Sequence, residues 1–202
     1  MATGCLATLS LTASLVGSFL AYDHSNLYQF TWLLPHLRHA RHLGNFHAGF
    51  DETTAALRHL LPTTQIDTFD FYDPIRHTEP SIRRARAAFP PLANTIAIPT
   101  HQIPLPAHSL DSALLFLAAH EIRCPTERAN FFRELNRVLQ PGAPLIVVEH
   151  LRDLPNLLAY SVGAWHFHSK SAWLTTFASA NLHLQSTHRF GGLITTFILC
   201  KA

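Results

Sequence analysis

Cysteine is scarce in this sequence, and its placement excludes two common ways of stabilising a small fold. The three cysteines, Cys5, Cys124 and Cys200, are far apart and odd in number, and no Cys-x-x-Cys pair occurs. Disulfide frameworks need paired cysteines, and structural zinc sites need closely spaced ones. The pattern therefore predicts neither, and it is typical of a protein that works in a reducing compartment such as the cytoplasm.

Charge is also scarce, which argues against a nucleic-acid-binding protein. Charged residues make up 14% of the chain, and the formal net charge is +2. A domain that binds nucleic acid needs a much larger basic excess. Three arginines share one predicted helix, Arg83, Arg84 and Arg86, and we expect them to form a solvated basic face. The expected partner is therefore a small molecule, and the sequence leaves the oligomeric state open.

The N-terminal segment lacks the charges that targeting signals carry. Residues 1–21 contain no acid and no base, and the first arginine is Arg38. A secretory signal begins with a positive region, and a membrane-spanning helix needs about 20 strongly apolar residues, whereas Thr, Ser and Gly dilute this stretch. We expect a soluble N-terminal segment and a cytoplasmic protein. Membrane association through this segment stays open as the less favoured alternative.

What the chain does have is a regular succession of apolar segments. It is 202 residues long and 48% hydrophobic, which suits one domain with a substantial core. We expect residues 1–39 to form a helical cap and residues 40–202 an α/β core. The pattern predicts helices at 53–61, 79–89, 126–140 and 169–182; strands after residue 40 and at 65–74, 93–99, 112–120, 144–150, 183–190 and 192–200; and a loop at 44–52.

The stretch from 112 to 150 indicates the architecture of the core. Residues 112–120 and 144–150 are continuous apolar runs of strand length, and the helix between them carries one apolar stripe before Pro141-Gly142. Strands that are apolar on both faces, alternating with amphipathic helices, are typical of a parallel sheet covered by helices on both sides. The last two strands have no helix between them, so they should form an antiparallel hairpin at one edge.

Two motifs in this region resemble those of a known family. Ser109-Leu110-Asp111 precedes one apolar run, and the helix that follows carries Phe132, Glu134 and Arg137-Val138-Leu139-Gln140-Pro141-Gly142. This succession resembles the fourth strand, fourth helix and fifth strand of class I S-adenosylmethionine-dependent methyltransferases. The resemblance implies a doubly wound, mostly parallel, seven-stranded Rossmann-like sheet with an antiparallel edge hairpin. It also implies S-adenosylmethionine as the cofactor.

The cofactor motif of that family is only partly present. The family's first strand ends in Gly-x-Gly-x-Gly, because the backbone passes close to the cofactor; here the equivalent positions hold one glycine between two polar residues. The acid that holds the ribose would be Asp70, which we favour, or Asp73. No acid follows the third strand, so another polar residue would have to contact the adenine. The cofactor-binding set implied by the resemblance is His47, Gly49, Asp51, Asp70, Asp73, Thr100, His101 and Leu117.

Polar residues end the two central strands. Ligands bind outside the carboxyl ends of parallel strands, and His120-Glu121 and Glu149-His150 stand at those ends, with His166 and His168 in a later loop. A histidine can remove a proton from an acceptor at neutral pH, and we name His120, His150 and His166 as candidate bases. Imidazole and carboxylate groups could instead bind a metal, and a purely structural role for each histidine also stays open.

These observations lead to one preferred function and two alternatives. We expect methyl transfer from S-adenosylmethionine to an oxygen, nitrogen or sulfur of a small, apolar or aromatic molecule, without a metal. The first alternative is a metal-binding enzyme with altered chemistry that uses the cluster His120, Glu121, His150, His166 and His168. The second is a non-catalytic binding or scaffold protein whose cofactor site has decayed. The aromatic residues Tyr22, Tyr28, Phe30 and Trp32 would form a lid or a docking surface.

Overall fold

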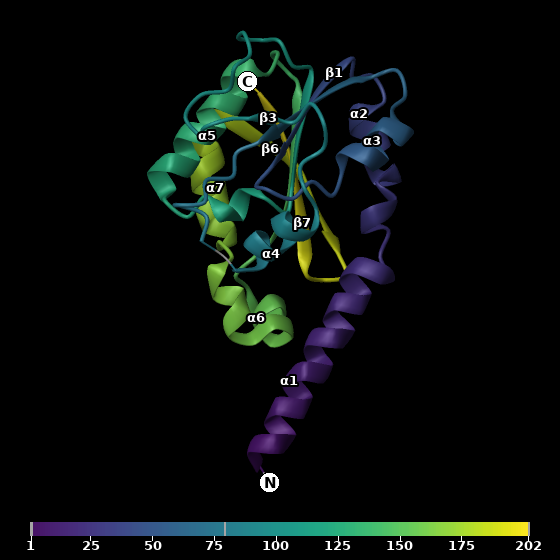
Figure 1. Cartoon of the computed structure of the whole chain (residues 1–202), viewed down its shortest axis with the longest axis vertical. Coiled ribbons are helices and arrows are strands. Elements are labelled where there is room, and N and C mark those ends of the chain that lie inside the picture. Colours follow the sequence, from purple (N-terminus) through teal and green to yellow (C-terminus); the bar gives the residue numbers. More distant parts are fainter. Residues whose placement is uncertain (1, 79, 202) are drawn as a thin grey trace.

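The core of the protein is a seven-stranded sheet, seen in the computed structural model of the chain (Figure 1). The structure describes residues 2–78 and 80–201, without the side chains of residues 2–7, 9 and 10. The strand order is β3-β2-β1-β4-β5-β7-β6, in which β7 runs antiparallel to both of its neighbours and the other pairs are parallel. The strands are β1 (His42–His47), β2 (Gln65–Asp70), β3 (Ile96–Ala97), β4 (Ser112–Phe116), β5 (Pro144–His150), β6 (Leu182–Phe190) and β7 (Ile194–Lys201).

Helices cover both faces of this sheet, as Figure 1 shows. Helices α5 and α7 lie against one face, and the N-terminal segment and α3 lie against the other. The predicted doubly wound fold with an antiparallel edge pair is therefore confirmed. The helical elements are α1 (Ala2–Ser18), η1 (Phe19–Asp23), η2 (Leu27–Gln29), η3 (Thr31–Leu33), α2 (Leu34–Leu37), α3 (Thr54–Leu60), α4 (Pro80–Ala88), η4 (Ala119–Glu121), α5 (Pro125–Val138), α6 (Leu154–Tyr160), η5 (Ser161–His166) and α7 (Lys170–Ser179).

The central strands are apolar on both faces because each face meets a separate layer of the core. Leu115 and Val147 belong to the cluster under α5 and α7, whereas their chain neighbours Leu114 and Ile146 belong to the cluster on the other face. Successive side chains of a strand point to opposite faces. A continuous apolar run is therefore the sequence pattern that a strand between two helical layers requires.

Local signals set the ends of several helices. Asp51 accepts hydrogen bonds from the backbone N–H groups of Thr53 and Thr54 at the start of α3, and the Ser169 hydroxyl accepts one from Ala172 at the start of α7. These contacts satisfy N–H groups that have no partner within the helix. The chain turns after α5 at Gly142, whose φ of +75° favours glycine.

Some predicted bounds were wrong. Residues 44–47 belong to strand β1 and are not loop, and the strand predicted at 112–120 ends at Phe116. Helices α6 and η5 occupy a stretch for which we predicted no regular structure, because its proline and aromatic residues hide the helical period. The strand predicted at 65–74 ends at Asp70, and the one at 93–99 is only Ile96–Ala97. Residue 79, the predicted start of α4, lies outside the described residues.

The N-terminal segment divides into a packed part and a projecting part. Leu27, Leu33 and Leu37 are fully buried against the sheet, whereas α1 runs away from the domain to the N-terminus (Figure 1). No helix within residues 2–78 and 80–201 is long and apolar enough to cross a bilayer. Cys124 and Cys200 are free thiols, and the side chain of Cys5 lies outside the described set.

Candidate active site

A cavity of about 310 Å³ lies at the carboxyl edge of the parallel strands. This is the edge at which open α/β sheets bind their ligands. Five parts of the chain contribute to its wall, namely the end of η1, the loop after β1, α4, the segment after β4, and the end of β5 with the helices that follow. Its lining residues are Tyr22, Phe50, Glu52, Ser81, Ile82, Ala85, Leu117, His120, Glu121, His150, Tyr160, His166 and Phe167.

His120 and Glu149 form a buried pair in the wall of this cavity. The Nδ1 atom of His120 lies 2.7 Å from Oε2 of Glu149, and its backbone N–H donates to Oε1 at 3.1 Å. Glu149 is completely buried and the His120 side chain is 12% exposed. Burial by itself would lower the pKa of His120, but the neighbouring Glu149 carboxylate outweighs it and raises that pKa above its ordinary value. An ionised carboxylate only accepts, so Nδ1 carries the proton and Nε2 is the basic atom.

His150 is held in a different hydrogen-bond arrangement. The amide of Asn156 donates to Asp153 and to the carbonyl of Leu193, so its oxygen faces Nδ1 of His150 at 2.9 Å. Nδ1 therefore donates to Asn156, and Nε2 accepts from the hydroxyl of Tyr22 at 2.6 Å. Burial lowers the pKa of His150 to about 4, so the ring is neutral at pH 7. Both nitrogens are occupied, which makes His150 a support for Tyr22.

His166 and His168 differ in where the structure places them. The His166 ring lies 5.7 Å from that of His120, measured between centroids, and it lines the cavity. Nε2 of His168 lies 3.0 Å from a guanidinium nitrogen of Arg128, and burial with this neighbouring cation lowers the pKa of His168 to about 4. A nitrogen that accepts a hydrogen bond from arginine is not available to a metal.

The described residues do not assemble a metal site from the histidine cluster. In the part of the chain that the structure describes, no three His, Cys, Asp or Glu side chains are placed to hold one ion. His150 is occupied by Tyr22 and Asn156, and His168 by Arg128. The hypothesis of a metal centre built from all five predicted residues is therefore not favoured.

Asp70 ends β2 and is 4% exposed. Its Oδ1 accepts from the backbone N–H groups of Gly49 at 2.8 Å and Tyr72 at 2.9 Å. Its Oδ2 accepts from the guanidinium of Arg86 on α4, which also stacks over the Tyr72 ring at 4.9 Å. Asp70, the residue predicted to hold the ribose, thus ends its strand with Oδ2 occupied by an arginine.

Where the glycine motif was expected, the chain forms one turn that needs glycine, at Gly49. Gly49 has a φ of +85°, and a Cβ there would lie 3.0 Å from the Tyr72 ring, so this position needs glycine. His47 is buried at the end of β1 with Nδ1 3.8 Å from Asp70, and burial lowers the pKa of its ring. Asp51 caps α3. Leu117, with a φ of +50°, lines the cavity beside His120.

A second cavity of about 270 Å³ is lined by Tyr72, Asp73, Thr100 and His101, among other residues. The Thr100 hydroxyl donates to Glu127 at 2.6 Å, and Arg76 donates to the same oxygen at 2.9 Å. Glu127 comes from the first turn of α5, so the structure supplies an acid where the sequence after the third strand has none. Sequence reasoning missed it because α5 begins far along the chain from that strand.

The Arg86–Asp70 pair lies close to residues of both cavities. Ala85 and Phe50, the chain neighbours of Arg86 and Gly49, line the first cavity, and Tyr72, which contacts both, lines the second. Sequence reasoning placed Arg86 on a solvated face. The structure corrects this expectation, since its side chain is only 35% exposed and pairs with Asp70.

Comparison with known proteins supports the methyltransferase-like fold that the sheet order suggests. Residues 53–147 match the family model described as a methyltransferase domain. This match and the sheet order show that the chain resembles class I methyltransferases. No curated protein matches it significantly.

Solved structures share the methyltransferase fold at low sequence identity. A SAM-dependent methyltransferase from Methanosarcina mazei is 12% identical with a TM-score of 0.62, covering 85% of this chain and 97% of its own. Geranyl diphosphate C-methyltransferase from Streptomyces coelicolor A3(2) is 10% identical with a TM-score of 0.61, covering 86% and 78%. The [4+2]-cyclase SpnF is 12% identical with a TM-score of 0.62, covering 98% and 94%. At these identities the likeness establishes the fold alone.

Proposed function

We propose that this protein transfers a methyl group from S-adenosylmethionine to an oxygen, nitrogen or sulfur atom of a small, apolar or aromatic molecule. The observation that carries the proposal is the His120–Glu149 pair, which presents a basic nitrogen in the wall of a cavity at the carboxyl edge of the sheet. Fold by itself does not choose the reaction, and one neighbour with this fold is named as a cyclase. The paired histidine is what favours methyl transfer to an acidic acceptor.

The residues present fit S-adenosylmethionine if Arg86 releases Asp70. Asp70 would hold the ribose hydroxyls through Oδ2, and Thr100 with Glu127 would line the adenine side in the second cavity. The first cavity would then hold the methionine end and the acceptor. When bound, the cofactor supplies an electrophilic methyl group, which the acceptor attacks in line.

His120 would remove the acceptor proton through Nε2. The Glu149 carboxylate fixes the tautomer by accepting from Nδ1, and it stabilises the imidazolium that forms. Catalysis of a displacement of this kind consists mainly of positioning the two reactants. Leu117 and Phe167 would position the acceptor by contact, since they line the cavity beside His120.

The cavity wall favours an apolar acceptor of modest size. Phe50, Ile82, Leu117, Tyr160 and Phe167 give it an apolar and aromatic character. Its volume of about 310 Å³ is at the lower end of the range for small-molecule sites, roughly 300–1,000 Å³. The acids of this wall are Glu52 and Glu121, and burial raises the pKa of Glu52 above its ordinary value. One neighbour with this fold is named as a geranyl diphosphate C-methyltransferase and was solved with that molecule, which supports an apolar acceptor.

Calorimetric titration with S-adenosylmethionine and S-adenosylhomocysteine tests the proposal. We expect binding in the micromolar range that Asp70→Ala abolishes. Asp67→Ala is the matched control, because Asp67 lies on the same strand as Asp70, pairs with His42 and lines neither cavity. Absence of binding at millimolar ligand would overturn the proposal and favour a non-catalytic binding protein. Equal loss in both variants would overturn the role of Asp70.

A further inference from the structure

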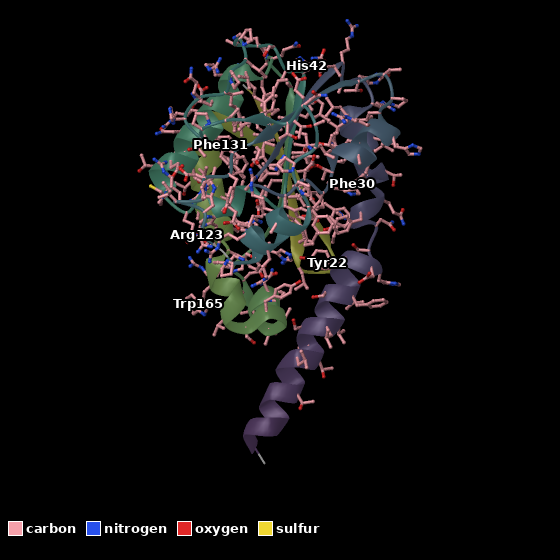
Figure 2. The ribbon with its side chains drawn as sticks, in the orientation of Figure 1. Tyr22, Phe30, His42, Arg123, Phe131 and Trp165 are labelled. Carbon is pink, nitrogen blue, oxygen red and sulfur yellow. The ribbon has the colours of Figure 1, made fainter. Side chains whose placement is uncertain are left out.

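One end of the molecule carries an exposed apolar surface formed by α1, α6 and η5. We call it the end surface and define it by Leu11, Leu15, Phe19, Leu158, Val162 and Trp165, whose exposed fractions lie between 55% and 83%. Large apolar residues that are exposed singly need no explanation, but a group of them on helices that contact one another indicates an interaction site. Figure 2 shows Trp165 at the same end of the domain, on the side of α6 and η5 away from α1.

The helices of the end surface pack together as one unit. A Cβ on Gly17 of α1 would lie 3.1 Å from the Cβ of Ala159 in α6 and 3.1 Å from the side chain of Leu193. The small residue at 17 therefore permits close contact between α1 and α6. Beyond this contact α1 continues outward, past α6, to the N-terminus (Figure 1). The end surface thus consists of the projecting helix α1 and, at its base, the helices α6 and η5, which we call the shoulder.

Helix α1 carries no charge and exposes large apolar residues. No charged residue precedes Asp23. Leu11, Leu15 and Val16 are all more than half exposed. A projecting helix of this kind can bury its apolar residues in lipid without placing a charge there.

The charges around the shoulder are complementary to an anionic lipid surface. Arg123, Arg152 and Lys170 are exposed next to the elements that form it, and Figure 2 places Arg123 directly above Trp165. The nearby acid, Asp153, is paired with Arg189. Basic residues that flank an apolar surface are attracted to anionic headgroups, and tryptophan is enriched at the membrane–water interface.

We propose that the end surface docks on an anionic lipid bilayer, with α1 entering one leaflet and Trp165 lying at the headgroups. The 17 residues of α1 span about 26 Å, and only the part beyond the contact with α6 enters the leaflet, whose depth is about half of a 30 Å hydrocarbon core. Insertion without crossing agrees with the absence of a membrane-spanning helix among the described residues.

This docking would bring the active-site cavity next to the lipid. Tyr160, His166 and Phe167 line the cavity, and they flank Val162 and Trp165 of the end surface in the sequence. The methyl acceptor is therefore a lipid-soluble molecule that enters from the bilayer. This last statement rests on the proposed function, whereas the docking itself does not.

Vesicle flotation of the full chain tests the docking. The probes are vesicles of phosphatidylcholine alone and vesicles in which half of the lipid is anionic phosphatidylglycerol. We expect the protein to float with the anionic vesicles, less at high salt, and the fluorescence of Trp165 to shift to shorter wavelength. Leu15→Glu and Val162→Glu should each reduce the floating fraction by roughly tenfold, because a carboxylate in lipid is costly. Trp165→Phe should float but lose most of the shift.

Ile75→Glu is the matched control, since Ile75 is 86% exposed but does not belong to the end surface, and it should float like the wild type. Failure of the wild type to float, or flotation that neither Leu15→Glu nor Val162→Glu reduces, would overturn the proposal. A dimer in sizing experiments that Leu15→Glu converts to a monomer, without flotation, would assign the surface to a second copy instead. Calorimetry with S-adenosylhomocysteine separates this outcome from failure of the proposed function.

Discussion

The pair between Arg86 and Asp70 leads to a prediction that runs against the usual effect of removing a salt bridge. If the cofactor's ribose must take the place of the arginine on Oδ2 of Asp70, then Arg86→Ala should tighten binding of S-adenosylhomocysteine. The same substitution leaves a buried carboxylate oxygen without its partner in the free protein. The variant should therefore be less stable without ligand and gain more stability when ligand binds.

The magnitude follows from the burial of the two groups. A hydrogen bond to a charged group contributes about 1.5–3 kcal/mol when it is desolvated. Asp70 is 5% exposed, but the Arg86 side chain is 35% exposed, so solvent screening reduces this contribution to about 1–1.5 kcal/mol. Removing that competition should lower Kd by about five- to tenfold. The Tm of the free protein should fall by about 2–6 °C at this chain length.

Titration calorimetry and thermal unfolding measure the two effects, and Arg84→Ala serves as the control. Arg84 lies on the same helix and is exposed, so its removal changes the charge of α4 without touching Asp70. The control should leave Kd and Tm close to the wild type. Unchanged or weaker binding by Arg86→Ala would refute the reasoning, because it would mean that Arg86 does not compete with the cofactor for Asp70.

The paired and buried histidines give two pH-dependent predictions. Glu149→Gln should lower the pKa of His120, followed by NMR titration of its ring, because burial then acts without the carboxylate; Glu121→Gln, whose oxygen is 3.5 Å from Nε2, should have a smaller effect. An unchanged pKa in Glu149→Gln would contradict the pairing. The neutral ring of His150, with a pKa of about 4, stabilises the fold above pH 6.5, and this stability is lost as the pH falls toward 4, by up to about 3 kcal/mol. Urea unfolding at pH 7 and 4.5 should show this loss, and His150→Gln should show less of it; an equal loss in both proteins would refute the assignment.

The sequence by itself determined the sheet and the identity of its central strands. The apolar runs at 112–116 and 144–150 specify strands that are buried on both faces, and the stripe of α5 specifies which side of that helix meets the sheet. These features follow from the spacing of apolar residues along the chain, which is set by residues close in sequence. The position of Asp70 at the end of a strand followed from the same pattern, whereas His120 lies in η4, after the end of β4.

Only the tertiary structure decided which side chains meet at those strand ends. Arg86 was expected on a solvated face and instead pairs with Asp70, and Glu127 reaches the second cavity from α5. Tyr22 bonds His150 across 128 positions of the sequence. Hydrophobic period specifies which face of an element is buried, but it carries no information about which distant polar group faces it. The sequence likewise did not determine that α1 projects from the domain, because an uncharged helical segment can either pack on the sheet or extend away from it.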